Sequence, residues 1–167
     1  HLPTRRQRQM CIRDSAASCI RTPTEGMVVH SENHRAKTAR KMVMELLVAD
    51  QPSRDTAHDP DSELWRYAET QDLDAARFPA KASPAPDSSH PAIAVNMDAC
   101  IQCNLCVRAC REVQVNDVIG LAGRGADAHI VFDFGDDMGA STCVGCGECV
   151  QACPTGALMP KLSLIHI

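Results

Sequence analysis

The feature that most constrains this chain is a run of four cysteines that occurs twice. In each copy three cysteines stand at two-residue gaps and a fourth follows after three further residues. The copies are Cys100, Cys103, Cys106 and Cys110, and then Cys143, Cys146, Cys149 and Cys153. Each cysteine of the second copy lies 43 residues after its counterpart, so the pattern predicts an internal duplication.

The spacing within each copy points to iron-sulfur chemistry. Three cysteines at two-residue gaps let one tight loop present three thiolates to a single cube, with backbone N–H groups turned toward the sulfides. In the bacterial two-cluster arrangement, the fourth cysteine of each run ligates the other cluster. The pattern therefore predicts two 4Fe-4S clusters, one held by Cys100, Cys103, Cys106 and Cys153 and the other by Cys143, Cys146, Cys149 and Cys110.

Zinc sites and disulfides are the alternatives for these cysteines. Zinc sites generally pair one C-x2-C with a second pair a dozen or more residues away, and a disulfide framework does not need the same spacing twice. The repeated spacing favours clusters. Because the chain has one Trp, one Tyr and three Phe, its aromatic core is small, and we expect metal binding and folding to be coupled.

Both ends of the chain look foreign to the rest. The segments Met10 to Ser15 and Leu162 to His166 can be encoded by opposite strands of one oligonucleotide, which resembles the transposase mosaic end of a sequencing-library adapter. Residues 1–15 and 162–167 are therefore expected to be translated adapter and non-native. Without them the net charge goes from -4 to about -7, which argues against a nucleic-acid binder. A basic N-terminal arm or an organelle-targeting peptide is the alternative.

The part that precedes the duplication predicts a strand, a helix and a connector. Met27 to Val29 suits a strand, and Ser31 is the expected helix N-cap. Apolar residues at helical spacing then predict an amphipathic helix over 31–49, whose methionines serve packing rather than metal binding. Residues 50–91 are rich in Asp, Pro, Ser and Ala and predict a connector, with a short helix around 62–67 whose Trp and Tyr anchor it.

Residues 92–161 are expected to form the two-cluster ferredoxin-like domain, which places the chain in the α+β class. The expected strands are 92–96, 118–121 and 130–132, and the expected helices are 105–113 and 147–152. Gly123 and Gly125 predict the turn between the paired strands. His129 is expected at the surface, and the acidic run from Asp133 to Asp137 in a solvated loop. No stretch is long and apolar enough to cross a membrane.

The residues from Cys100 to Ile119 and from Cys143 to Leu158 resemble the N-terminal iron-sulfur region of the alpha subunit of NAD-dependent, molybdopterin-containing formate dehydrogenases. Related modules occur in iron-only hydrogenases and in the large iron-sulfur subunit of respiratory complex I. Arg111 stands where simple ferredoxins have proline, which fits this larger family and lets the helix continue through Val113. The resemblance spans nearly all of residues 16–161.

The resemblance implies that the chain is the electron-transfer part of a larger oxidoreductase. Electrons would pass from a molybdenum or tungsten site on molybdopterin guanine dinucleotide, where formate is oxidised, to NAD-reducing flavin and iron-sulfur partner subunits. The catalytic residues would lie downstream of Lys161. Reduced cysteines and the coupling to NAD favour a cytoplasmic location. An iron-only hydrogenase module and a stand-alone electron carrier are the alternatives.

Cys19 is the candidate remnant of a further cluster. Cys19 and the run from Thr22 to Val29 look like the last ligand and closing strand of a plant-type 2Fe-2S domain, so residues 16–30 are expected to be its C-terminal end. The other three ligands would lie upstream, because Cys11 belongs to the adapter. This chain is therefore not expected to assemble a 2Fe-2S cluster, and a lone buried thiol is the alternative for Cys19.

The segment after the predicted helix departs from many relatives of this family. They carry a 4Fe-4S site there with one histidine and three cysteines, whereas residues 50–91 contain no cysteine. His58 and His90 are consequently not expected to be cluster ligands.

Overall fold

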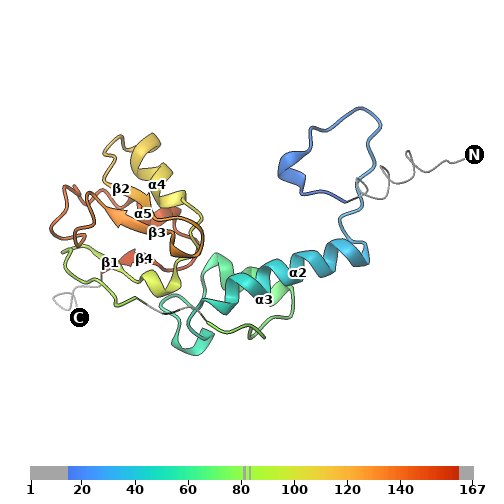
Figure 1. Ribbon diagram of the computed structural model, residues 1–167, viewed down its shortest axis with the longest axis horizontal. Coiled ribbons are helices and arrows are strands. Elements are labelled where there is room, and N and C mark those ends of the chain that lie inside the picture. Colours follow the sequence, from blue (N-terminus) through green and yellow to red (C-terminus); the bar gives the residue numbers. More distant parts are fainter. Residues whose placement is uncertain (1–14, 81, 83, 162–167) are drawn as a thin grey trace, which may run out of the picture. The chain divides into compact units, whose positions relative to one another are not determined.

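The structure, a computed structural model, describes residues 15–80, 82 and 84–161. The predicted adapter ends lie outside these residues, apart from Ser15. The chain divides into two compact units, with the boundary between Met42 and Val43. This boundary lies within helix α2 (His34–Ala49) (Figure 1). The domain limits predicted from the sequence remain predictions.

The first unit holds a short 3-10 turn, η1 (Ser18–Ile20), and the first turns of α2. The strand predicted at Met27 to Val29 is wrong: these residues are exposed and form no strand, because no described strand pairs with them. The predicted cap is also wrong, since α2 begins at His34. The Asn33 side chain accepts a hydrogen bond from the Ala36 N–H at 2.8 Å, so Asn33 caps the helix in place of Ser31.

The second unit begins with the end of α2, which packs against the predicted connector. A buried cluster joins them: Val48, Trp65, Ala68 and Leu73. Helix α3 (Glu63–Thr70) confirms the short helix expected there. Trp65 is buried as predicted, but Tyr67 is exposed, so only one of the two aromatic residues anchors the segment. Met44 packs against the cluster, whereas the packing role expected for Met42 is wrong because its side chain is exposed.

A buried carboxylate on α2 adds a polar tie to the same segment. Glu45 is 4% exposed and accepts hydrogen bonds from Arg77 Nε at 2.6 Å, Arg77 Nη2 at 2.8 Å and the Arg77 backbone N–H at 3.1 Å. The carboxylate raises the pKa of the Arg77 guanidinium. A short 3-10 turn, η2 (Arg54–Thr56), precedes α3. The predicted connector therefore packs on the helix before it and on itself.

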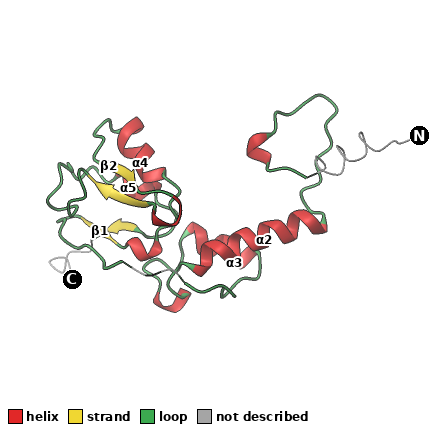
Figure 2. Cartoon of the chain, viewed as in Figure 1, coloured by secondary structure: helices red, strands yellow, loops and turns green. Residues whose placement is uncertain are grey.

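Two antiparallel pairs of strands frame the cysteine-rich domain (Figure 2). Strand β1 (Ile93–Val95) pairs with β4 (Leu158–Pro160), and β2 (Ile119–Ala122) pairs with β3 (His129–Phe132). The three predicted strands are confirmed. Strand β4 was not predicted, because it has only three residues and ends in a proline. Since β1 and β4 come from opposite ends of the domain, their pairing closes it.

The two predicted helices are confirmed as well. Helix α4 (Leu105–Arg108) continues without a break into a π-helical turn, η4 (Ala109–Val113), and the second copy forms α5 (Glu148–Ala152). The helices pack against each other, α4 also against β2 and α5 against β4. Two 3-10 turns complete the domain, η3 (Met97–Ala99) and η5 (Gly125–Asp127).

The core of this domain is aliphatic and includes cysteine. Its buried members come from both strand pairs and both copies of the run: Ile93, Val95, Cys106, Cys110, Val118, Ile119, Ile130, Phe132, Met138, Cys149 and Leu158. Phe132 is its only aromatic side chain, as the composition led us to expect. Among the described residues, no helix combines the length and apolar character needed to cross a membrane.

Candidate metal centres

Each cysteine triplet begins with a loop whose backbone is left-handed at two positions. These positions have φ between +57° and +79° and are Gln102 and Asn104 in the first copy, Gly145 and Gly147 in the second. The N–H of Gln102 donates to Cys100 Sγ at 3.4 Å, and the N–H of Gly145 donates to Cys143 Sγ at 3.4 Å. The two loops thus share one backbone conformation, which turns N–H groups toward sulfur.

The first hollow contains thiols from both copies of the run. It is lined by Cys100, Cys103, Cys106 and Cys153, and apolar side chains such as Met97, Ile130 and Leu158 complete its wall. Cys106 lies at the start of α4 and is buried. Burial raises the pKa of Cys106 to about 12, and the neighbouring thiols of Cys100, Cys153 and Cys103 add to the shift.

The second hollow has the complementary set. It is lined by Cys110, Cys143, Cys146 and Cys149, with Ile93, Val118 and Ile119 among its apolar neighbours. Burial raises the pKa of Cys149 to about 12, with further contributions from Cys143, Cys146 and Cys110. The fourth cysteine of each run therefore lies with the first three of the other run. These are the two sets that the spacing predicts, and their assignment as cluster ligands stays a prediction.

The chemistry of the two sets fits a bound metal group. A thiol with a pKa near 12 is protonated at neutral pH, so a buried ligand becomes a thiolate only when a metal takes the place of its proton. No disulfide joins the cysteines that the structure describes.

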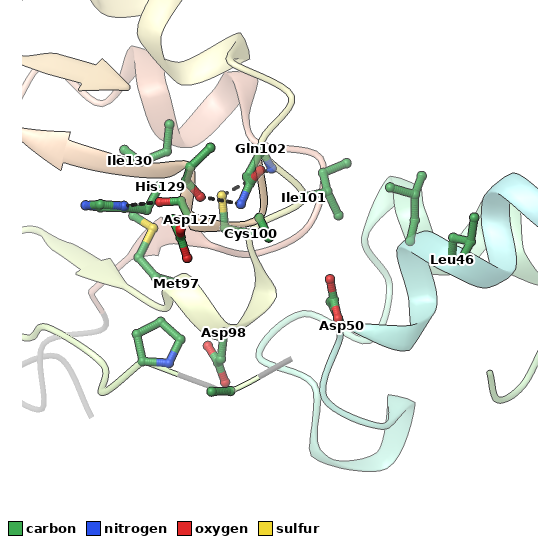
Figure 3. A pocket seen from close by; sticks show the side chains of 15 residues that line it. Leu46, Asp50, Met97, Asp98, Cys100, Ile101, Gln102, Asp127, His129 and Ile130 are labelled. Atoms are coloured by element: carbon green, nitrogen blue, oxygen red, sulfur yellow. Dashed lines mark hydrogen bonds between the residues drawn. The ribbon is translucent and has the colours of Figure 1, made fainter. Parts of the chain in front are cut away.

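A larger open cavity of about 680 Å³ lies beside Cys100 (Figure 3). Its wall combines the end of α2 with η3 and the start of β3, including Leu46, Met97 and Ile130. The Gln102 side chain also lines it and donates from Nε2 to the carbonyl oxygen of Ala128. This bond ties the first loop to the strand hairpin, and no sequence signal pointed to it.

The histidines and acidic residues singled out from the sequence have structural partners. His58 Nε2 lies 2.9 Å from Asp98 Oδ2, and His129 is exposed as expected. Of the acidic run, Asp136 and Asp137 are exposed, but Asp133 is half-buried. Asp133 is less solvated than expected, because its carboxylate accepts hydrogen bonds from the Thr142 N–H at 2.6 Å and the Thr142 hydroxyl at 3.0 Å.

Cys19 lies on η1 in the first unit and is exposed, which contradicts the alternative of a buried thiol. Its role as an orphaned 2Fe-2S ligand stays a prediction.

Comparison with known proteins matches residues 91–157 to the 4Fe-4S dicluster domain. Among curated relatives, the NADP-reducing hydrogenase subunit HndD of Solidesulfovibrio fructosivorans is 35% identical over 88% of this chain and 26% of its own length. An NADH-quinone oxidoreductase subunit of Rhizobium meliloti is 30% identical over 85% of this chain and 17% of its own. A putative formate dehydrogenase of Staphylococcus haemolyticus is 25% identical over 85% and 15%.

The chain thus spans about a quarter or less of the length of these relatives. In a crystal structure of an NAD+-reducing [NiFe]-hydrogenase in the H2-reduced state, one chain shares the fold with a TM-score of 0.80, covering 89% of this chain and 64% of that one at 24% identity. Residues 91–157 are therefore a 4Fe-4S dicluster domain, and the chain is an iron-sulfur electron-transfer module of a kind found in oxidoreductase subunits.

Proposed function

We propose that this chain passes single electrons between a catalytic site in the remainder of the protein and NAD-reducing flavin and iron-sulfur partner subunits. The observation that carries the proposal is the pair of hollows, each lined by four thiols of which one comes from the other copy of the run. A bound 4Fe-4S cluster supplies reversible one-electron chemistry, at a potential set by charge, hydrogen bonds to sulfur and solvent exposure.

The residues of this chain would hold and shield that group. The ligands would be Cys100, Cys103, Cys106 and Cys153 in the first hollow, and Cys143, Cys146, Cys149 and Cys110 in the second. The apolar walls shield the buried sulfurs of Cys106, Cys110 and Cys149 from water, and the loop N–H groups that point at sulfur favour the more negative, reduced state. No bond-making chemistry falls to this chain.

The catalytic site that we favour is a formate-oxidising one on molybdopterin guanine dinucleotide, with molybdenum or tungsten. Support comes from the amino-acid sequence of the two cysteine runs and from the similarity to putative formate dehydrogenases. A cytoplasmic location follows from the coupling to NAD.

A hydrogenase subunit is the second candidate. It is favoured by the 35% identity to an NADP-reducing hydrogenase subunit over most of this chain. A stand-alone electron carrier is the third.

The cluster assignment is tested by anaerobic reconstitution of the chain with iron and sulfide. We expect about eight irons per chain, visible charge-transfer absorption, and the EPR signal of two interacting reduced clusters. A colourless chain that binds zinc in preference to iron would overturn it.

The catalytic assignment is tested on the protein encoded by the complete gene. We expect reduction of NAD with formate and none with H2. The reverse result identifies the hydrogenase candidate, and a gene that ends soon after Lys161 identifies a stand-alone carrier.

A further inference from the structure

A buried histidine packs against the second cysteine loop. The buried imidazole of His90 lies against Gly145, which stands between Cys143 and Cys146. A methyl group on Gly145 would lie 3.6 Å from His90 Cε1 and 3.9 Å from His90 Nε2. The imidazole ring therefore packs directly beside Gly145, where a side chain on residue 145 would contact it.

Hydrogen bonds select one tautomer of the neutral His90 ring. His90 Nδ1 accepts from the backbone N–H groups of Ala92 and Ile93, both at 3.1 Å. A nitrogen that accepts two hydrogen bonds carries no proton, so in the neutral ring the proton is on Nε2. Nε2 has no hydrogen-bond partner among the residues that the structure describes. This donor, which has no partner among the described residues, lies on the side of the ring that meets the cysteine loop.

The backbone around His90 is held from several sides. The Asp87 carboxylate accepts from the Ser89 N–H and from the Met138 N–H, each at 2.8 Å. Lys161 Nζ donates to the carbonyl oxygens of Ser88 at 2.6 Å and His90 at 3.3 Å. The side chain therefore has little freedom to leave the loop.

The first loop has a different neighbour at the equivalent position. In place of Gly145 it has Gln102, whose side chain donates to the Ala128 carbonyl oxygen. His129 lines the open cavity beside Cys100 and Gln102, but it is exposed, and no histidine is among the residues that line either hollow. His90 is therefore a buried imidazole packed on the second loop, whereas the histidine near the first loop is exposed.

We propose that His90 is a positioning residue for the second metal centre, and that its Nε2–H acts as a hydrogen-bond donor beside the Cys143–Cys146 loop. The inference rests on the proposed function, because it requires a cluster in the second hollow. A donor near the thiolates stabilises the extra negative charge of the reduced state. The second centre would therefore have a higher reduction potential with His90 than without it.

His90→Asn is the matched test, because the asparagine side-chain oxygen can accept the same two backbone hydrogen bonds while the ring and its donor are lost. At a fixed solution potential, we expect the ratio of reduced to oxidised second cluster to fall about tenfold, which is about 59 mV for one electron. The first cluster should be unchanged. His129→Asn removes an exposed histidine that lines the cavity beside the first loop, and it should leave the second cluster unchanged.

A spectroscopic measurement on the unaltered chain avoids dependence on how the variant folds. With ¹⁵N-labelled histidine, pulsed EPR of the reduced chain should detect a weak nitrogen coupling that is retained in His129→Asn and absent in His90→Asn. No coupling in the unaltered chain, or a redox ratio in His90→Asn that is unchanged or shifts equally at both clusters, overturns the inference. A chain that binds fewer than about eight irons instead overturns the proposed function, so the two failures are distinguishable.

Discussion

The two copies of the cysteine run have the same loop but differ after the fourth cysteine. Cys110 is followed by Arg111, and the helix continues as a π-helical turn to Val113 before the chain enters the strand hairpin. Cys153 is followed by Pro154, and α5 ends at Ala152. Proline has no N–H and disfavours helical backbone in the residue before it, so the second helix stops where the first continues.

Because α5 ends early, the backbone after it is available for a hydrogen bond to another segment. The carbonyl oxygen of Pro154 accepts a hydrogen bond from the N–H of Leu64 at 3.1 Å, which joins α3 to the end of the second run. The two loops are alike where three cysteines share one loop, whereas the residues after the fourth cysteine differ and make the connections of the fold.

The largest expected effect tests the crossing between the copies. Cys110→Ser should remove the cluster of the second hollow and leave that of the first, lowering the iron content from about eight to about four per chain. The reason is that Cys110 lies with Cys143, Cys146 and Cys149 rather than with its own triplet. Iron analysis and EPR measure the outcome.

Cys19→Ser is the control, because Cys19 is exposed on η1 in the first unit, and it should not change the iron content. Loss of the cluster next to Cys100 and Cys103 in Cys110→Ser would show that each copy binds its own cluster.

The next effect tests the difference in the helices. Arg111→Pro makes the first copy resemble the second, and proline inside a helix costs about 3 kcal/mol or more. We expect a lower midpoint of thermal unfolding and easier loss of iron to a chelator. Arg111→Ala should do neither, because the ion pair between Arg111 and Asp117 is exposed. Equal effects of the two variants would mean that the Arg111 side chain, and not the continued helix, stabilises the domain and retains iron.

A smaller effect compares the left-handed positions of the loops. Gly147 has φ of +79°, and a Cβ there would meet no atom within 4 Å, so Gly147→Ala should cost only backbone strain of about 1 kcal/mol. Asn104 has φ of +61°, and its buried Oδ1 has no hydrogen-bond partner among the described residues, so Asn104→Gly should be neutral or slightly stabilising. Chemical denaturation of the reconstituted chains measures both. Destabilisation by Asn104→Gly would indicate that the side-chain amide of Asn104 stabilises the first metal centre.

Much of the fold could be predicted because its signals are local. The strand at Ile93–Val95, the paired strands, and both helices after the triplets follow from short apolar runs and the cysteine spacing. The strands that were wrongly predicted or missed are those whose formation depends on a pairing strand elsewhere in the chain. Met27 to Val29 has the composition of a strand but no described strand to pair with, and β4 is too short to recognise without β1.

The candidate sites divide in the same way. The cysteine spacing predicts which three thiols share a loop, whereas nothing local in the sequence marks the contact of His90 with Gly145, 55 residues away, or the bond of Asp133 to Thr142. A histidine or aspartate has the same appearance in a sequence whether it is solvated or buried. Its role depends on what packs against it.

The sequence by itself determined that two loops would each present three thiols to one point, because the loop geometry depends on neighbouring residues alone. The choice of the fourth cysteine in each set was predicted by analogy with the bacterial two-cluster arrangement, and the tertiary structure is what brings that cysteine to the other loop. That placement depends on how the chain between Cys110 and Cys143 folds and on the pairing of β1 with β4, which brings the ends of the domain together. The same packing buried His90 against the second loop and left His129 exposed, since burial and contacts arise only when distant segments meet.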